Sequence, residues 1–106
     1  MSTLKQQRRN RLHLADMLEN RIADKNFNIR VWTNDCGTVG CALGIAVLSG
    51  EFGYGWNKGL PVKNGREAYW WEVGPDLFGD YTYTNVFTDF NPRSRQTVAA
   101  ELRAIK

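Results

Sequence analysis

The sequence predicts a single α+β domain, in which an N-terminal amphipathic helix and further helices pack on a small antiparallel sheet. Three patterns predict this fold: helical spacing of apolar residues near both ends of the chain, strand-like alternation after the first helix, and an Asn-Gly turn between two strand-like stretches. Of the 106 residues, 42% are hydrophobic and 24% are charged, which is typical of a globular domain. We therefore treat residues 1–106 as one domain.

The first predicted element is a long amphipathic helix from Thr3 to about Asp24. Its apolar residues recur at helical spacing, and charged residues fill the opposite side. His13 lies off the centre of the apolar stripe, so we expect a surface histidine rather than a catalytic one. The predicted stripe consists of Leu4, Leu12, Ala15, Leu18 and Ile22, widened by Leu14 and Met17.

A strand and a short buried helix are predicted next. Apolar and polar residues alternate from Phe27 to Trp32, which places Trp32 on the face opposite the core residues. After a turn-rich connector, the run from Cys41 to Leu48 is apolar on every side and fits a fully buried helix. Gly44 within this run indicates close packing against another element.

A β-hairpin is predicted around Asn64-Gly65, the strongest short hairpin signal in the chain. Its arms are Leu60–Lys63 and Arg66–Val73. Pro61 has no backbone N–H to donate, so we expect the first arm at an edge of the sheet. The stretch from Glu67 to Trp71 is also compatible with the start of a helix.

The last third of the chain contains three helical patterns. Pro75-Asp76 opens a short helical turn, and the stretch from Tyr81 to Phe90 predicts another helix that stops at Asn91-Pro92. Ser94 can N-cap a final helix. The buried stripe of this final helix is predicted to be Val98, Leu102 and Ile105, with Ala99 beside them.

The net charge of +3 is concentrated near the N-terminus. Residues 1–30 contain seven Lys or Arg against three Asp or Glu, and residues 31–106 contain seven against eight. This excess suits local attraction of a polyanion but is small for a DNA-binding domain, so a solvated helix face is the favoured interpretation. No apolar run reaches roughly 18–20 residues, the length of a membrane span, and no secretory signal is recognisable. We expect a cytosolic protein that has neither a membrane nor a nucleic acid as partner.

The sequence predicts neither an enzyme nor a cofactor. Cys36 and Cys41 have a single histidine, His13, to join them, so Cys and His alone cannot fill a four-ligand zinc site. In a reducing compartment the two cysteines are expected to be free thiols. We also find no Ser-His-Asp arrangement that His13 completes and no pair of carboxylates flanking a recognisable cleft.

The most distinctive stretch is a glycine-rich turn from Cys36 to Cys41 that leads into the predicted buried helix. A helix N-terminus offers free backbone N–H groups, which suit a phosphate or a carboxylate. The alternative is structural: Thr38 caps the helix, and both cysteines act as small buried hydrophobic residues. The stretch lacks the Gly-Lys-Ser/Thr ending of a Walker loop and the glycine pattern of dinucleotide-binding proteins.

Four features occur together in this chain: a CGT-x-x-C-x-x-G pattern after an N-terminal helix, a later Leu-Phe-Gly element, a Val-Phe pair and the closing helix. In these features the chain resembles a loose family of small phage and prophage-type bacterial proteins. The resemblance covers roughly half of the chain, and the close matches are Cys36, Gly37, Thr38, Cys41 and Gly44. The family has no catalytic residues to carry over. What the resemblance implies is a phage or mobile-element setting, in which small single-domain proteins often bind and block a host component.

The aromatic residues are the main lead to function, because four Trp is a high count for this length. If the second hairpin arm is a strand, Tyr69 and Trp71 lie on one face and Trp70 on the other, so one tryptophan is directed outward. Flat rings beside cations can sandwich a nucleobase, with each stack contributing about 1–3 kcal/mol. The same rings can anchor a protein interface, or all four Trp can fill and border the core.

We therefore expect a non-catalytic, phage-type binding protein that sequesters a nucleotide second messenger of host immunity in the host cytosol. Trp rings are expected to stack on the base, while the N–H groups of the glycine turn, together with Arg66 or an N-terminal arginine, contact phosphate. The alternative is a protein inhibitor that covers a host factor with its aromatic patch, and a nucleic-acid-binding accessory protein is a weaker third hypothesis. A homo-oligomer would deepen a shallow pocket. The predicted ligand-binding residues are Trp32, Cys36, Gly37, Thr38, Trp56, Arg66, Trp70 and Trp71.

Overall fold

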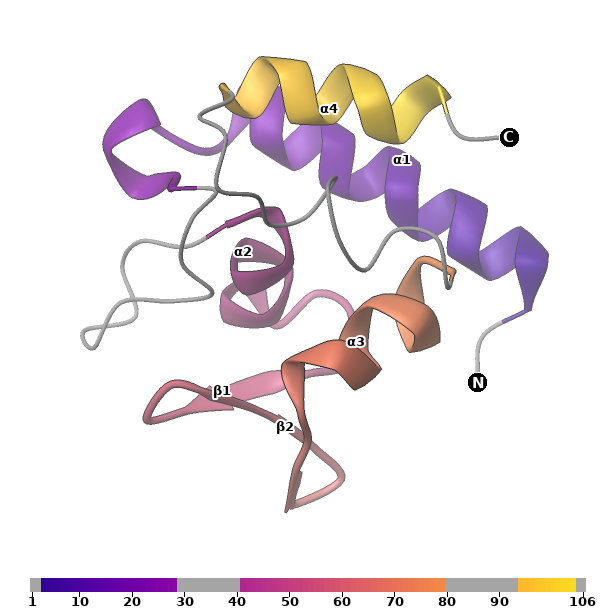
Figure 1. The fold of residues 1–106 in the computed structure, drawn as a ribbon, viewed down its shortest axis with the longest axis vertical. Coiled ribbons are helices and arrows are strands. Elements are labelled where there is room, and N and C mark those ends of the chain that lie inside the picture. The colour runs from indigo at the N-terminus through magenta and orange to yellow at the C-terminus, as the bar shows by residue number, and fades with distance from the viewer. Residues whose placement is uncertain (1–2, 29–40, 80–93, 105–106) are drawn as a thin grey trace.

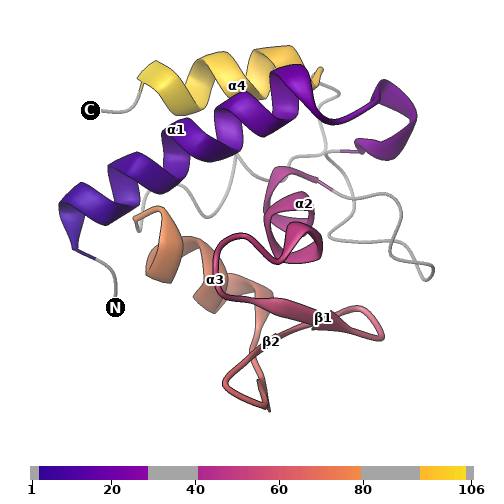
Figure 2. The ribbon, with the colours of Figure 1, turned by 180° about the vertical axis from the view of Figure 1, so that it is seen from behind.

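The computed structural model describes residues 3–28, 41–79 and 94–104, with the backbone but not the side chain of Trp71. These residues form the predicted α+β fold, with helices packed beside a three-stranded antiparallel sheet (Figure 1). Seen from both sides, α1 and α4 lie next to each other, and the sheet lies at the opposite end of the molecule (Figure 2). The described elements are α1 (Leu4–Asn20), a 3₁₀ turn (Asp24–Asn26), α2 (Ala42–Ser49), β1 (Gly55–Asn57), β2 (Leu60–Lys63), β3 (Arg66–Glu67), α3 (Trp70–Leu77) and α4 (Arg95–Ala104).

The predicted N-terminal helix is confirmed as α1, and Thr3 is its N-cap. The Thr3 hydroxyl accepts a hydrogen bond from the Gln6 backbone N–H at 3.2 Å. In return, the Gln6 side chain accepts from the Thr3 backbone N–H at 3.0 Å, which completes a capping box. The helix ends at Asn20, before the predicted end, and the 3₁₀ turn follows it.

The buried face of α1 differs from the predicted stripe in its N-terminal half. Leu14 and Leu18 are fully buried, whereas Leu4 is 83% exposed and Leu12 is 42% exposed. The inward positions of the first turns are instead taken by Gln7 and Arg11, which are both buried. Polar residues occupy these positions because α1 meets the C-terminal end of α3 here, where free carbonyl groups need hydrogen-bond donors.

Two side chains of α1 provide these donors. Arg11 Nη1 donates to the carbonyl oxygen of Phe78 at 2.6 Å, and Asn10 Nδ2 donates to that of Leu77 at 2.9 Å. Arg11 is only 3% exposed, so its hydrogen bond lies in the interior of the protein. The first and third helices are therefore joined by polar as well as apolar contacts.

The predicted final helix is confirmed as α4, with Ser94 as its cap. The Ser94 hydroxyl accepts a hydrogen bond from the Thr97 backbone N–H at 3.1 Å. Val98 and Leu102 of the predicted stripe and the adjacent Ala99 are buried, while Ile105 lies outside the described residues.

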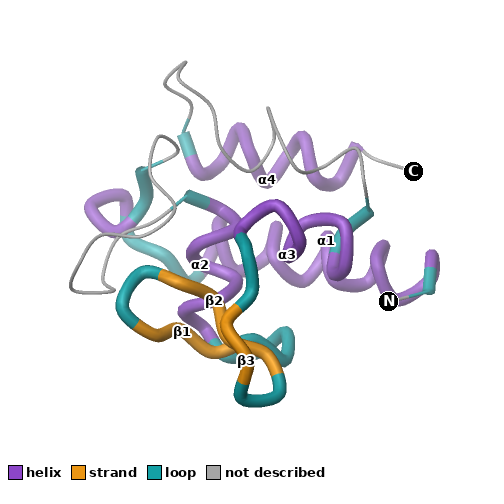
Figure 3. The backbone as a smooth tube through the Cα atoms, turned by 60° about the horizontal axis from the view of Figure 1, so that its bottom comes forward, coloured by secondary structure: helices purple, strands orange, loops and turns teal. Residues whose placement is uncertain are grey.

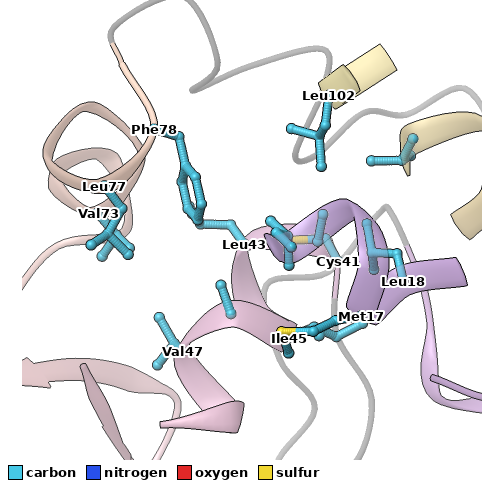
Figure 4. Close-up of a cluster of buried hydrophobic side chains, with 14 of the residues drawn as sticks. Met17, Leu18, Cys41, Leu43, Ile45, Val47, Val73, Leu77, Phe78 and Leu102 are labelled. Atoms are coloured by element: carbon cyan, nitrogen blue, oxygen red, sulfur yellow. The ribbon is translucent and has the colours of Figure 1, made fainter. Parts of the chain in front are cut away.

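The predicted buried helix is confirmed as α2, whose residues 42–47 are all buried. Its apolar surface explains this position, because a helix that is hydrophobic all round is stable only inside the protein. Figure 4 shows side chains from α1, α2, α3 and α4 directed toward one another around α2. Phe78, Leu14, Met17, Leu18 and Leu43 are the largest fully buried side chains of this core.

The sheet is a meander with two tight turns. Asn64 and Gly65 have positive φ angles of 54° and 77°, as a type I′ turn requires, so the predicted hairpin is confirmed in its position. A second two-residue turn, Lys58-Gly59, joins β1 to β2, and its φ angles are also positive, at 50° and 89°. The sequence analysis did not predict this second hairpin.

Pro61 lies in the central strand of the sheet, so the expectation of an edge strand is wrong. Its missing N–H points toward Ala68, where pairing ends: Ala68 N–H donates to the Pro61 carbonyl at 2.8 Å, and β3 stops at Glu67. Proline is tolerated because no strand continues on that side to accept its hydrogen bond.

The second arm of the hairpin is much shorter than predicted. It ends at Glu67, and Trp70 begins α3, so the face assignment that directed one tryptophan outward does not apply. Pro75 was predicted to open a helical turn, but it lies inside α3. Figure 3 shows that the strands lie beside α2 and α3, on the side away from α4.

Two predicted elements fall mainly on residues that the structure does not describe. Only Phe27 and Asn28 of the predicted strand are described, and the predicted helix from Tyr81 to Phe90 lies entirely outside the described residues. In the described part of the chain, no helix has the length and apolar character needed to cross a bilayer.

Candidate functional site

A cavity of about 390 Å³ lies between the second hairpin and the first turn of α3. It is open to solvent and combines two basic side chains, an aromatic ring and two carboxylates. Its lining residues are Tyr54, Lys63, Asn64, Arg66, Glu67, Ala68 and Glu72, and we call it the hairpin cavity.

The register of the sheet brings the basic side chains together. Lys63 and Arg66 are direct partners across β2 and β3, so their side chains lie on the same face of the sheet. Gly55 pairs with Val62, which places the adjacent Tyr54 on the same face as Lys63. The type I′ turn therefore fixes which residues line the cavity.

Asp76 of α3 holds two of the lining residues in place. Its Oδ2 atom accepts a hydrogen bond from the Tyr54 hydroxyl at 2.8 Å and from Lys63 Nζ at 2.7 Å. Lys63 Nζ also lies 5.2 Å from the centre of the Tyr54 ring, within cation–π range. Lys63 thus has a fixed position on the wall of the cavity.

The ionisation of this network follows from its contacts. Burial would raise the pKa of the Asp76 carboxyl, but hydrogen bonds from Lys63 and Tyr54 outweigh it and lower the pKa below its ordinary value. Burial, and then the hydrogen bond to Asp76, raise the pKa of the Tyr54 hydroxyl. At neutral pH Tyr54 is therefore a neutral donor and Asp76 a charged acceptor.

Arg66 differs from Lys63 in having no fixed partner. Its side chain is exposed, and it forms no ion pair with any residue that the structure describes. Like charges directly opposite each other in a sheet destabilise the pair. Asp76 compensates the charge of Lys63, whereas the charge of Arg66 faces the cavity without such compensation.

The structure gives different positions to the tryptophans of the predicted site. Trp70 is buried, and its indole Nε1 donates to the carbonyl of Gly59 at 3.0 Å, so its ring is part of the core and cannot stack on a ligand. Trp56 is half-buried against the core. Trp71 belongs to α3, but the structure describes only its backbone. Trp32 lies outside the described residues.

The glycine turn of the predicted site, Cys36, Gly37 and Thr38, lies outside the described residues. The helix that follows it begins at Ala42, and Cys41 is the residue at its N-cap position. Cys41 is fully buried, and burial raises the pKa of its thiol to about 12. This thiol is a poor nucleophile, because the reactive thiolate is not formed near neutral pH.

A charged cluster around Glu51 borders a second cavity of about 270 Å³, between the end of α1 and α2. Arg21 binds both carboxylate oxygens of Glu51, at 2.9 and 2.7 Å, and His13 Nε2 lies 3.1 Å from Oε1. The hydrogen bonds from Arg21, and next the hydrogen bond with His13, lower the pKa of Glu51 to about 2, although partial burial opposes this. Arg21 and His13 thus both contact the Glu51 carboxylate.

Of the eight predicted site residues, only Arg66 is shown to line a cavity among the described residues. The sequence analysis missed Tyr54, Lys63 and Asp76. The sequence contained a signal for Lys63, because the residues that flank a two-residue Asn-Gly turn are cross-strand partners, and here they are Lys63 and Arg66. Within the described residues, no group of three His, Cys, Asp or Glu side chains is placed to hold a metal ion.

Comparison with known proteins yields no match: no family model, no curated protein and no solved structure is significantly similar to this chain.

Proposed function

We propose that this protein is a non-catalytic binding module that sequesters a small phosphorylated ligand of the nucleotide class in the hairpin cavity. The observation that supports this proposal is the pairing of Lys63 with Arg66 at the cavity wall. Asp76 compensates the charge of Lys63 but not that of Arg66, so a bound phosphate would supply the negative charge that Arg66 lacks. The cavity volume of about 390 Å³ is within the usual range for small-ligand sites.

Four of the seven lining residues have a role in this proposal. Arg66 offers a planar fork of N–H donors, which suits two oxygens of one phosphate. Lys63, held by Asp76, supplies a second positive charge from a fixed position. The small Ala68 side chain leaves room for the nucleoside part of the ligand beside Tyr54.

The resemblance to small phage proteins narrows the choice among phosphorylated ligands. It suggests a nucleotide second messenger of host immunity, bound in the host cytosol and removed from its receptor without chemical change. Such a function needs affinity and abundance rather than catalytic residues.

Calorimetric titration with cyclic and linear nucleotides tests the proposal. Arg66→Gln should weaken binding by about tenfold or more, because a charge-assisted hydrogen bond to phosphate is lost. Lys25→Gln is the matched control, since it also removes one exposed cation but lies on the 3₁₀ turn, away from the cavity. A wild-type protein that binds no nucleotide of the panel would refute the proposal. Equal losses in both variants would show that only net charge matters.

A protein partner is the second candidate function. Tyr69, the residue before α3, is 56% exposed, and exposed tyrosines are typical anchors of protein interfaces. Native mass spectrometry of the protein purified from immune-active cells separates the two candidates. A co-purifying small mass supports the nucleotide, and a co-purifying chain supports the inhibitor.

A further inference from the structure

The N-terminal turns of α1 present three exposed cations on one side of the helix. Lys5, Arg8 and Arg9 are spaced i, i+3 and i+4, so they are neighbours on the helix surface, and all three are exposed. We call these residues the basic ridge. In both ribbon views this end of α1 extends beyond the end of α4, so α4 does not cover it (Figures 1 and 2).

The ridge differs from the other basic residues in being a group of cations without ion pairs among the described residues. Four other Arg or Lys side chains are paired with carboxylates: Arg21 with Glu51, Lys63 with Asp76, Arg95 with Asp24, and Arg103 with Glu19. The other exposed cations that the structure leaves without an ion pair lie singly on the 3₁₀ turn, in the turn between β1 and β2, and on β3, namely Lys25, Lys58 and Arg66. The end of α1 therefore presents three such cations on one helix surface.

The position of the ridge is unfavourable in the isolated protein. Cations near a helix N-terminus oppose the helix dipole, which favours negative charge there. The first turn of α1 contains no acidic residue that would offset this effect. A polyanion bound along the ridge would interact favourably with the cations and with the dipole at once.

We propose that the basic ridge docks the protein on the phosphate backbone of a nucleic acid, without reading its sequence. The three cations span about 6 Å along the helix, which suits neighbouring phosphates of one strand. Nucleic-acid binding is the weaker third hypothesis from the sequence, because the N-terminal excess of cations is small for a DNA-binding domain and fits a solvated helix face. The structure adds that the charges are grouped, exposed and unpaired among the described residues.

Two other occupants fit the ridge less well. An amphipathic helix that lies in a lipid surface must insert its apolar face, but the apolar face of α1 is packed in the core through Leu14 and Leu18. A second copy of this chain would bring two ridges of the same charge together. The close spacing of the three cations therefore favours the phosphate backbone of a nucleic acid as the binding partner.

Fluorescence anisotropy with a labelled duplex DNA tests this surface. The variant K5Q/R8Q/R9Q should bind at least tenfold more weakly than the wild type at 50 mM salt. Three phosphate contacts predict a wild-type affinity loss of about 40-fold between 50 and 200 mM salt, and the variant should lose most of this dependence. The matched control K25Q/K58Q/R103Q removes three exposed cations outside the ridge and the hairpin cavity, and it should change affinity by less than threefold.

The outcomes separate the possibilities. Equal losses in both triple variants, or a wild-type protein that binds phosphatidylserine vesicles but not the duplex, would overturn the proposal. Substitution is preferred to deletion of residues 1–11, because Gln7 and Arg11 are buried and a deletion would damage the fold. Thermal melts of all variants control for folding. Nucleotide binding to the hairpin cavity should persist in K5Q/R8Q/R9Q, so the two proposals fail independently.

Discussion

Glu51 shows how single side chains couple the stability of this protein to pH. Arg21 and His13 both bind its carboxylate, and they lower its pKa to about 2 from an ordinary value of 4.5. A carboxylate whose pKa is lower in the folded than in the unfolded state stabilises the fold above the unfolded value. This contribution is lost as the pH falls from about 4.5 toward 2.

Glu51→Gln is therefore expected to lower the melting temperature near neutral pH, and the difference from the wild type should shrink between pH 4.5 and pH 2. Thermal melts across this pH range measure it. Glu67→Gln is the control, because Glu67 is an exposed carboxylate without an ion pair among the described residues. A constant difference across the range would show that Glu51 acts through packing rather than charge.

Lys58 occupies a backbone conformation that suits other residues better. Its φ angle of 50° lies in the left-handed region, where Asn is tolerated more readily than residues with longer side chains. Lys58→Asn should raise the free energy of unfolding by about 0.5–1 kcal/mol, measured in urea. Lys58→Ala removes the same charge but keeps the unfavourable conformation, so it should leave stability nearly unchanged. A gain in both variants would assign the effect to charge.

At the scale of the elements, the helix ends are held by side chains from distant parts of the chain. Arg95, the first residue of α4, donates from Nη1 to the carbonyl oxygens of Leu18 and Glu19 at the end of α1. Its Nε donates to Asp24 in the 3₁₀ turn at 2.7 Å. One guanidinium therefore closes α1 and fixes the segment that follows it.

Arg95→Met should lower the free energy of unfolding by about 2 kcal/mol, because buried carbonyl groups lose a charged donor. Arg103→Met is the comparison on the same helix. Its partner Glu19 is 33% exposed and Arg103 itself is 39% exposed, so this change should cost only about 0.5 kcal/mol. Urea denaturation of both variants distinguishes the two roles, and similar losses would contradict the assignment of Arg95 as a helix cap.

The elements that sequence patterns predict well here are those with strong local signals. Thr3 and Ser94 mark helix starts, and Asn64-Gly65 marks a hairpin. The second hairpin was missed because Lys58 is an uncommon residue in a type I′ turn. The first turn of α3 was assigned to the second hairpin arm, with the start of a helix as the alternative, because the choice depends on tertiary contacts such as the hydrogen bond from the Trp70 indole to Gly59.

The candidate site was less predictable than the fold. The four tryptophans were taken as binding candidates because of their number, yet Trp70 is part of the core, which composition cannot reveal. The hairpin cavity depends on the register that pairs Lys63 with Arg66 and on Asp76, which comes from a later helix. Sequence patterns that act over a few residues do not contain this information.

At the scale of the whole molecule, Cys41 is a natural probe of global unfolding. The thiol is completely buried in the core between α1, α2 and α4 (Figure 4). In a Cys36→Ala variant, Cys41 is the sole thiol, because the chain has two cysteines. Its reaction with a thiol reagent should be slow and should accelerate with urea along the global unfolding curve. Fast labelling without urea would show that the core opens locally.

The pairing of α1 with α4 has a consequence for synthesis of the protein. Translation releases α1 from the ribosome before α4, so the apolar face of α1 lacks its partner until Val98 and Leu102 have emerged. Contacts between such distant segments also form late in folding. The nascent chain therefore carries an uncovered apolar helix until α4 has emerged, and we expect chaperones to protect α1 in the interval.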